Sequence, residues 1–194
     1  MSISYFLMIM VQATVPVAPT ATPEARMALA NFAACVVDRS GDKAADILSR
    51  DFRTTEYRNG LKNLARANED CATRAGIENR MRMDNLPFAA ALAEVMLERD
   101  PAPLKVRLAK AAATEVPTFS PSDQVAMCMA RSAPDEAAAL FAANVGTADE
   151  EKAAANLAPA FRICSKSAKM EASTTGLRSI LATASFRLLA AQKG

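Results

Sequence analysis

The spacing of the cysteines constrains this chain more than any other feature. The 194-residue sequence contains four cysteines, and Cys35 is separated from Cys71 by the same 36 positions that separate Cys128 from Cys164. Each cysteine of the first pair has its counterpart in the second pair at an offset of 93 residues. A spacing that recurs in this way is typical of an internal repeat.

The sequence around the cysteines repeats at the same offset. The clearest matches pair Asp42 with Asp135, Thr54 with Thr147, and Asn63-Leu64-Ala65 with Asn156-Leu157-Ala158. After a deletion of about four residues, Ala91-Leu92-Ala93 corresponds to Ile180-Leu181-Ala182. We therefore predict a tandem duplication, with one unit at residues 23–100, a Pro/Ala/Lys-containing linker at 101–118 and a second unit at 119–194.

Each unit is expected to fold as four helices. The chain is rich in alanine and has only 6 glycines, a composition that favours helices. In the first unit, apolar residues at helical spacing predict a helix from Pro23 to about Arg39, a short helix around 44–48 and a third through 61–75. The fourth has one expected apolar face, made by Phe88, Ala91, Leu92, Val95 and Met96. Since the second unit repeats each step, starting at Ser120-Pro121, the predicted fold class is all-α.

One disulfide in each unit is the simplest use of the four cysteines. Four cysteines allow three pairings, and only Cys35–Cys71 with Cys128–Cys164 treats the two units alike while remaining local. Each bond would join the first and third helices of its unit and stabilise it by roughly 3 to 4 kcal/mol in the chain-entropy model. The alternative is four reduced thiols that act as small buried apolar groups. There is no CxxC pair, so neither a thioredoxin-like redox site nor a compact zinc site is indicated.

The N-terminus has features of an export signal. The apolar run from Tyr5 to Val11 is followed by small residues and prolines, and residues 1–22 are predicted to be a leader and linker, cleaved after Ala13 or near Ala18 to Ala21. The run is too short for a stable membrane anchor. The usual basic region is missing, since the first cation is Arg26, and the alternative is a disordered N-terminus of a cytosolic protein. Together with the cysteines, the leader predicts a periplasmic or secreted protein.

Several chemistries are excluded by composition. The chain has no histidine, which removes Ser-His-Asp and Cys-His catalysis and histidine-ligated metals. With no tryptophan, two tyrosines, eight phenylalanines and a net charge of +2, the sequence offers no surface for nucleic acid. We expect no cofactor, no metal and no catalytic residue.

The candidate binding residues are cations. A basic segment at the end of the third predicted helix contains Arg74, Arg80 and Arg82, and Lys105 lies in the linker. These residues are candidates for a site that binds an anion or a lipid headgroup. The alternative is a solvated helix end, where cations complement the helix dipole. Glu94 and Glu98, one turn apart, are expected on a surface helix face, and Thr147 with Glu150 has the spacing of a capping box.

These observations predict a non-catalytic exported protein with a structural, adaptor or protein-binding role, acting through an unknown protein partner or by self-association. The alternative is a carrier of a small apolar or amphiphilic ligand between its helices. Such a carrier needs an unfilled cavity of several hundred cubic ångströms. A third possibility is a glycan-cleaving enzyme that uses a carboxylic acid and needs no histidine, although the sequence has few aromatic residues to line a sugar cleft.

Overall fold

The computed structural model of the chain describes residues 21–77, 85–168 and 170–192. The predicted leader lies almost entirely outside these residues, as do Arg80 and Arg82. In the described ranges the chain forms ten helices and no strand, so the all-α prediction is confirmed. None of these helices is both long enough and apolar enough to cross a membrane.

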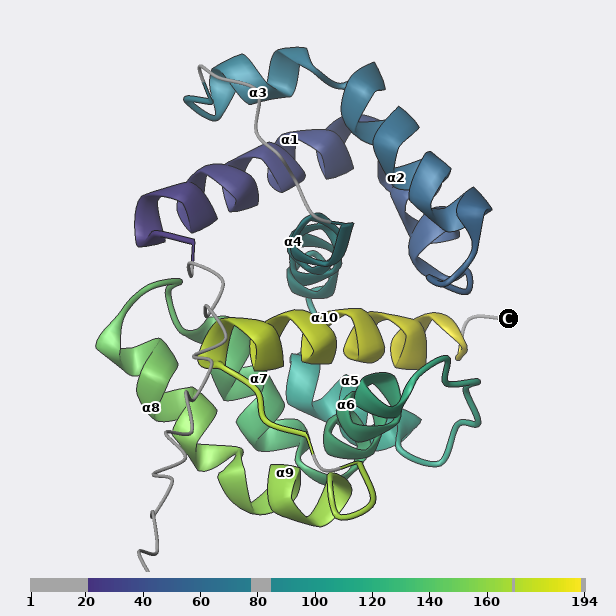
Figure 1. Cartoon of the computed structure of the whole chain (residues 1–194), viewed down its shortest axis with the longest axis vertical. Coiled ribbons are helices and arrows are strands. Elements are labelled where there is room, and N and C mark those ends of the chain that lie inside the picture. Colours follow the sequence, from purple (N-terminus) through teal and green to yellow (C-terminus); the bar gives the residue numbers. More distant parts are fainter. Residues whose placement is uncertain (1–20, 78–84, 169, 193–194) are drawn as a thin grey trace, which may run out of the picture.

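The helices form two halves that lie one above the other (Figure 1). The upper half consists of α1 (Pro23–Leu48), α2 (Thr55–Ala67), α3 (Asp70–Arg74) and α4 (Asn85–Glu98). Helix α1 contains the predicted break between the first two helices, since Ser40 has non-helical backbone angles of φ −140° and ψ 33°. The predicted third helix is divided into α2 and α3, which meet at Asn68.

The lower half consists of α5 (Leu104–Ala111), α6 (Pro121–Ser132), α7 (Pro134–Ala142), α8 (Ala148–Asn156), α9 (Ala158–Cys164) and α10 (Thr174–Ala190). Helix α5 occupies the predicted linker, and it packs on α6, α7 and α10. Its buried Leu108 and Ala111 explain this position, because they complete the apolar core of the lower half.

Local sequence determines where the principal helices begin. The hydroxyl of Thr22 accepts a hydrogen bond from the Ala25 backbone N–H, and Ser120 does the same for Asp123 N–H. A proline follows each of these caps at the first helical position, as predicted. The side chains of Thr54, Thr147 and Ser173 cap α2, α8 and α10 in the same way.

Both predicted disulfides are present. Cys35–Cys71 joins α1 to α3, and Cys128–Cys164 joins α6 to α9. The Cα atoms are 5.7 and 5.8 Å apart, within the range that a disulfide requires. Each bond therefore fastens a short peripheral helix, α3 or α9, to a longer helix of the same half, α1 or α6.

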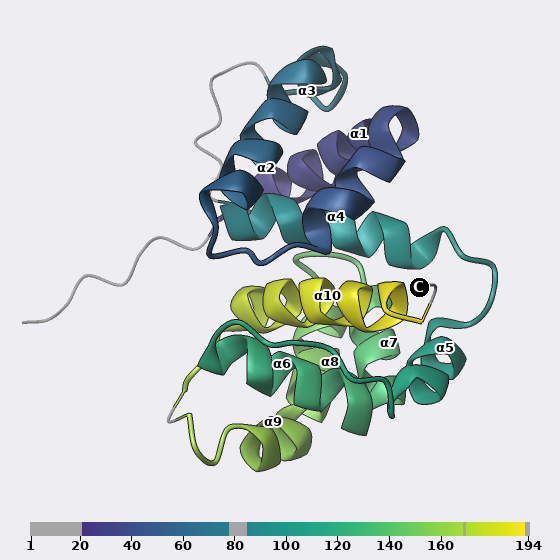
Figure 2. The same cartoon turned by 90° about the vertical axis from the view of Figure 1, so that its right-hand side faces the viewer.

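Helices α4 and α10 form the junction between the halves. Helix α4 lies between α1 and α10, and the second view shows α4 directly above α10 (Figure 2). Because α4 has neighbours on two sides, it buries Ala89, Ala90 and Ala93 in addition to the predicted Phe88 and Leu92. The alanines let the helices approach closely, and one apolar core runs through both halves.

Candidate functional site

The structure places the candidate binding cations far from one another. Arg74 is exposed in the last turn of α3, in the upper half. Lys105 is exposed on α5, in the lower half, with its Nζ atom 3.6 Å from a carboxylate oxygen of Asp135. Helices α3 and α5 are well separated in both views (Figures 1 and 2). The described residues therefore do not bring Arg74 and Lys105 together, and Arg80 and Arg82 lie outside them.

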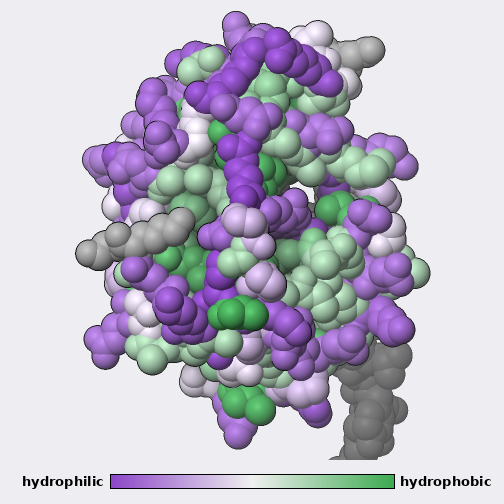
Figure 3. Space-filling view, turned by 180° about the vertical axis from the view of Figure 1, so that it is seen from behind, coloured by the Kyte–Doolittle hydropathy of each residue, from purple (hydrophilic) through white to green (hydrophobic). Residues whose placement is uncertain are grey.

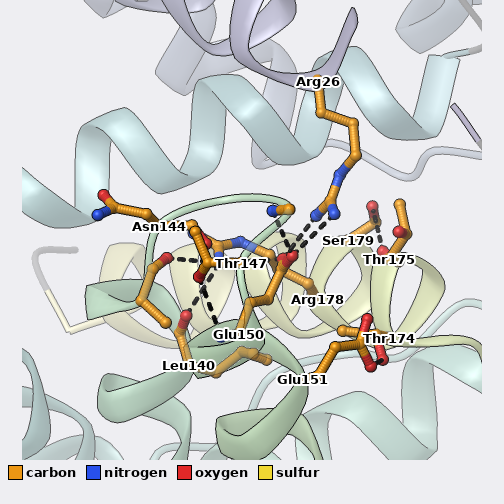
Figure 4. A network of polar contacts seen from close by, with 12 residues as sticks. Arg26, Leu140, Asn144, Thr147, Glu150, Glu151, Thr174, Thr175, Arg178 and Ser179 are labelled. Carbon is orange, nitrogen blue, oxygen red and sulfur yellow. Dashed lines mark hydrogen bonds and ion pairs between the residues drawn. The ribbon is translucent and has the colours of Figure 1, made fainter. Parts of the chain in front are cut away.

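A different set of charged residues meets where the two halves join. Its centre is Glu150, in the first turn of α8, whose side chain is 0% exposed. Both terminal nitrogens of Arg26, from α1, donate to the Glu150 carboxylate at 2.6 and 2.8 Å. The backbone N–H of Gly146 donates to it at 2.8 Å, and Arg178 Nη1, from α10, donates at 3.2 Å (Figure 4). Four N–H groups from three parts of the chain thus satisfy one buried carboxylate.

Arg178 connects this carboxylate to a second one. Its Nε and Nη2 atoms donate to Oε2 of Glu94, on α4, at 2.9 and 2.7 Å. Its Nη1 atom also donates to the backbone carbonyls of Leu140 and Ala143, at the C-terminal end of α7, at 3.0 and 2.9 Å. Carbonyls at a helix end lack partners within the helix, so a cation is well placed there. The network extends from α1 and α4 in the upper half to α8 and α10 in the lower half.

The loop before α8 holds Glu150 in place. Thr147 caps α8 as the capping-box spacing predicted, with its hydroxyl accepting from Glu150 N–H at 3.4 Å. The Glu150 side chain, however, bonds to Gly146 N–H and to the two arginines, so it is more than a capping residue. Gly146 has φ +77°, and a Cβ atom there would lie 2.6 Å from Cβ of Pro23. Glycine thus allows this loop to touch the start of α1.

The two glutamates differ in their affinity for a proton. Burial raises the pKa of Glu94 above its ordinary value and outweighs the opposing hydrogen bonds and charge of Arg178. Burial also disfavours the charged form of Glu150, but there the hydrogen bonds from Arg26 and Gly146, with the charges of Arg26 and Arg178, outweigh it and lower the pKa. Glu150 is therefore the firmly ionised member of the pair.

A cleft of about 830 Å³ opens beside the network. Its walls come from the start of α1, from α4, from the α4–α5 connection, and from α7 and α10. The larger apolar residues that line it are Leu29, Val95, Leu97, Leu104, Phe141 and Val145. Arg26, Glu94, Glu98 and Arg178 also line it. In the view from behind, apolar residues reach the surface at mid-height, where the halves meet (Figure 3).

A second, smaller hollow of about 170 Å³ lies elsewhere between the halves. It is lined by Phe52 and Tyr57 from the upper half and by Asp123 and Arg187 from the lower half. Arg187 pairs with the buried Asp123, and its guanidinium lies over the ring of Phe119, 4.9 Å from the centroid. Burial raises the pKa of Tyr57 to about 12, so its hydroxyl stays protonated. Aromatic rings occupy much of the space here.

Neither the network nor the cleft was predicted from the sequence. Glu94 was expected on a surface helix face, whereas its side chain is only 16% exposed and pairs with Arg178. The available signal was a departure from the predicted repeat. In that alignment Glu94 corresponds to Thr183 and Glu150 to Tyr57, so each glutamate is matched with an uncharged residue. A charge without a counterpart in the predicted repeat points to a role of its own.

No group of three or more acidic or cysteine side chains that could hold a metal ion occurs among the described residues. Comparison of the chain with protein-family models, with curated proteins and with solved structures gives no match.

Proposed function

We propose that the protein is a non-catalytic carrier of a small, largely apolar ligand, which it binds in the cleft between its two halves. The observation that supports this role is the cleft of about 830 Å³. Ligand sites in proteins usually enclose about 300 to 1,000 Å³, with mostly apolar walls and a few fixed polar groups. The apolar side chains around Glu94 and Arg178 fit that description. Of the two roles expected from the sequence, the cleft favours the carrier over a purely structural or adaptor role.

We also propose that the fold arose by tandem duplication. Helices α1 to α4 follow one another as α6 to α10 do, with α7 matching the second part of α1. Helix α1 packs on α4 in the upper half, and α6 packs on α10 in the lower half. The cysteines and the capping threonines Thr54 and Thr147 correspond at the offset of 93.

The two hollows support the duplication more specifically, because they correspond to each other. Residues of the small hollow have counterparts in the cleft at an offset of 93, or of 89 beyond the deletion. These pairs are Leu48 with Phe141, Phe52 with Val145, Ser122 with Leu29, Asp123 with Ala30, Ile180 with Ala91, Thr183 with Glu94, and Arg187 with Glu98. A duplicated pair of units that packs about a twofold axis would contain two related clefts, and the correspondence of these lining residues supports that arrangement.

The two copies differ in what fills them. Phe52 and Tyr57 line the small hollow, and Phe119 packs against Arg187 beside it. The corresponding positions are Val145 and Arg26, which line the cleft, and Glu150, which is buried beside it. Rings close one copy, whereas the other has smaller or charged side chains and remains open. In this proposal the closed copy stabilises the junction and the open copy binds the ligand.

Export is part of the proposal. Two disulfides within small helical units are typical of oxidising compartments. Mass spectrometry of the protein recovered from the periplasm of a bacterial host tests it in one spectrum. We expect a chain shortened at its N-terminus, with both disulfides and a bound small molecule. An unprocessed, reduced chain contradicts export.

Binding of Nile red, a neutral dye that fluoresces in apolar sites, tests the carrier role. We expect saturable binding at one site per chain. Ala91→Phe on α4 and Ala142→Phe on α7, both at residues that line the cleft, should each weaken binding at least about tenfold, since a benzyl group fills part of the space. Ala155→Phe, on the exposed face of α8 outside the cleft, is the matched control and should leave binding unchanged. Equal binding by all three folded variants would refute the proposal.

A further inference from the structure

The cationic groups that line the cleft already have hydrogen-bond partners within the chain. Both terminal nitrogens of Arg26 are engaged by Glu150. All three side-chain nitrogens of Arg178 donate to Glu94, to Glu150 or to backbone carbonyls. Arg107 donates to the carbonyls of Leu97 and Ala102, around the end of α4. A phosphate or carboxylate ligand would have to compete for donors that already have partners.

Acceptor groups in the cleft, by contrast, remain available. Both hydrogen bonds from Arg178 to Glu94 end on Oε2, and no described residue donates to Oε1. Glu98 follows one turn later on α4, is exposed, lines the same cleft, and has no ion-pair partner within the described ranges. Residues four apart on a helix share a face, so the two carboxylates lie side by side.

The charges around the cleft therefore leave one negative charge uncompensated. Arg26 is paired with Glu150, and Arg107 lies 3.7 Å from Asp100. Of the two remaining carboxylates that line the cleft, Arg178 bonds to Glu94 and not to Glu98, and it also donates to the buried Glu150. A positive group placed at Glu94 Oε1 and Glu98 would balance the charge in a partly dehydrated site, where ion pairs are stronger than in water.

We propose that the ligand of this cleft is a small organic cation, a protonated amine or a guanidinium on an apolar body, whose charged group pairs with Glu94 and Glu98. This inference depends on the carrier role proposed above. The apolar body would lie against residues such as Leu29, Val95 and Phe141, all of which line the cleft. The polarity is the opposite of the anionic headgroup that the arginine-rich segment suggested from sequence.

Three probes of equal chain length test the charge preference: octylammonium, 1-octanol and octanoate, each titrated calorimetrically into the full chain below its aggregation concentration. We expect octylammonium to bind about tenfold more tightly than 1-octanol, and octanoate to bind most weakly. Glu98→Gln should weaken octylammonium binding about threefold and leave 1-octanol binding unchanged. The control Glu115→Gln, on an exposed loop outside the cleft, should change neither affinity.

Glu94→Gln should have the larger effect, since its carboxylate is less exposed than that of Glu98. Because Glu94 also pairs with Arg178, binding by Glu94→Gln is compared only if its circular dichroism spectrum and melting temperature match those of the parent. Glu98→Gln tests the proposal whether or not Glu94→Gln meets this condition. Equal affinities for the three probes, or tightest binding of octanoate, would overturn the cationic ligand and leave the carrier role standing. Failure of Nile red and of all three probes to bind would overturn both.

Discussion

Removing the carboxylate of Glu150 tests whether this buried charge stabilises the contact between the two halves. In Glu150→Ala, the Gly146 N–H and both terminal nitrogens of Arg26 lose their acceptor. Arg178 keeps Glu94 and the carbonyls at the end of α7. The substitution therefore leaves one cation largely buried and without its partner, and leaves a second cation with fewer partners.

The expected cost follows from this arrangement. Removing one partner of a buried ion pair typically destabilises a protein by about 3 to 5 kcal/mol. Glu150→Ala should lower the free energy of unfolding by about 3 kcal/mol, because Arg178 retains Glu94 and because Arg26, 14% exposed, can regain some water. With a urea dependence of about 2 kcal/mol per molar, the unfolding midpoint should fall by about 1.5 M.

Equilibrium unfolding in urea, followed by circular dichroism, measures this change. Glu151→Ala is the matched control, since the neighbouring glutamate is exposed and accepts one hydrogen bond, from Thr174 Oγ1 at 2.6 Å. It should cost only about 0.5 kcal/mol. Combining Glu150→Ala with Arg26→Ala should cost less than the two single changes together, by about 1 kcal/mol or more, because the second removes the cation that the first leaves unpaired. Equal costs for Glu150→Ala and Glu151→Ala would show that the buried carboxylate does not stabilise the junction between the halves.

Three further outcomes are expected. Cys35→Ser should lower the free energy of unfolding by about 4 kcal/mol without reductant and show no difference from the parent in reductant, as measured by urea unfolding. Gly146→Ala should lower the melting temperature more than Gly76→Ala: both glycines have positive φ, but only at Gly146 does the new Cβ meet another residue, Pro23, at 2.6 Å. Octylammonium affinity, measured by calorimetry across a pH series, should fall as the solution is acidified, and the fall should begin at a higher pH in the parent than in Glu94→Gln, because burial raises the pKa of Glu94 against the effect of Arg178. Protonation of Glu94 removes the negative charge that pairs with the ligand, so identical pH profiles in the two proteins would contradict this prediction.

The helical framework was predictable because its signals are local. Proline after a hydroxyl residue at Thr22 and Ser120, and apolar residues at helical spacing, depend only on neighbours in sequence. The disulfides were predictable because the matched spacing left one pairing that treats both units alike and keeps each bond local. The division of the third helix at Asn68 was not predicted, because the apolar spacing continues through Cys71 although the backbone does not.

The candidate site was not predictable in the same way, because its residues meet only through tertiary packing. Glu150 is 124 positions from Arg26, and Arg178 is 84 positions from Glu94. From sequence, a glutamate among alanines on a helix is most often a surface residue, and the one-sided face expected for α4 rested on that rule. Because α4 packs against both α1 and α10, it is shielded from water on two sides and not on the one side that the sequence predicted.

The placement of the disulfides has a mechanical consequence. All four cysteines are used within halves, Cys35–Cys71 in the upper and Cys128–Cys164 in the lower, so the covalent path between the halves is the single connection from Glu98 to Leu104. The bonds stiffen each half as a body, while ion pairs and packed side chains alone set the separation of the two bodies. No disulfide therefore fixes the width of the cleft, and a change in redox conditions acts within each half and not on the joint between the halves.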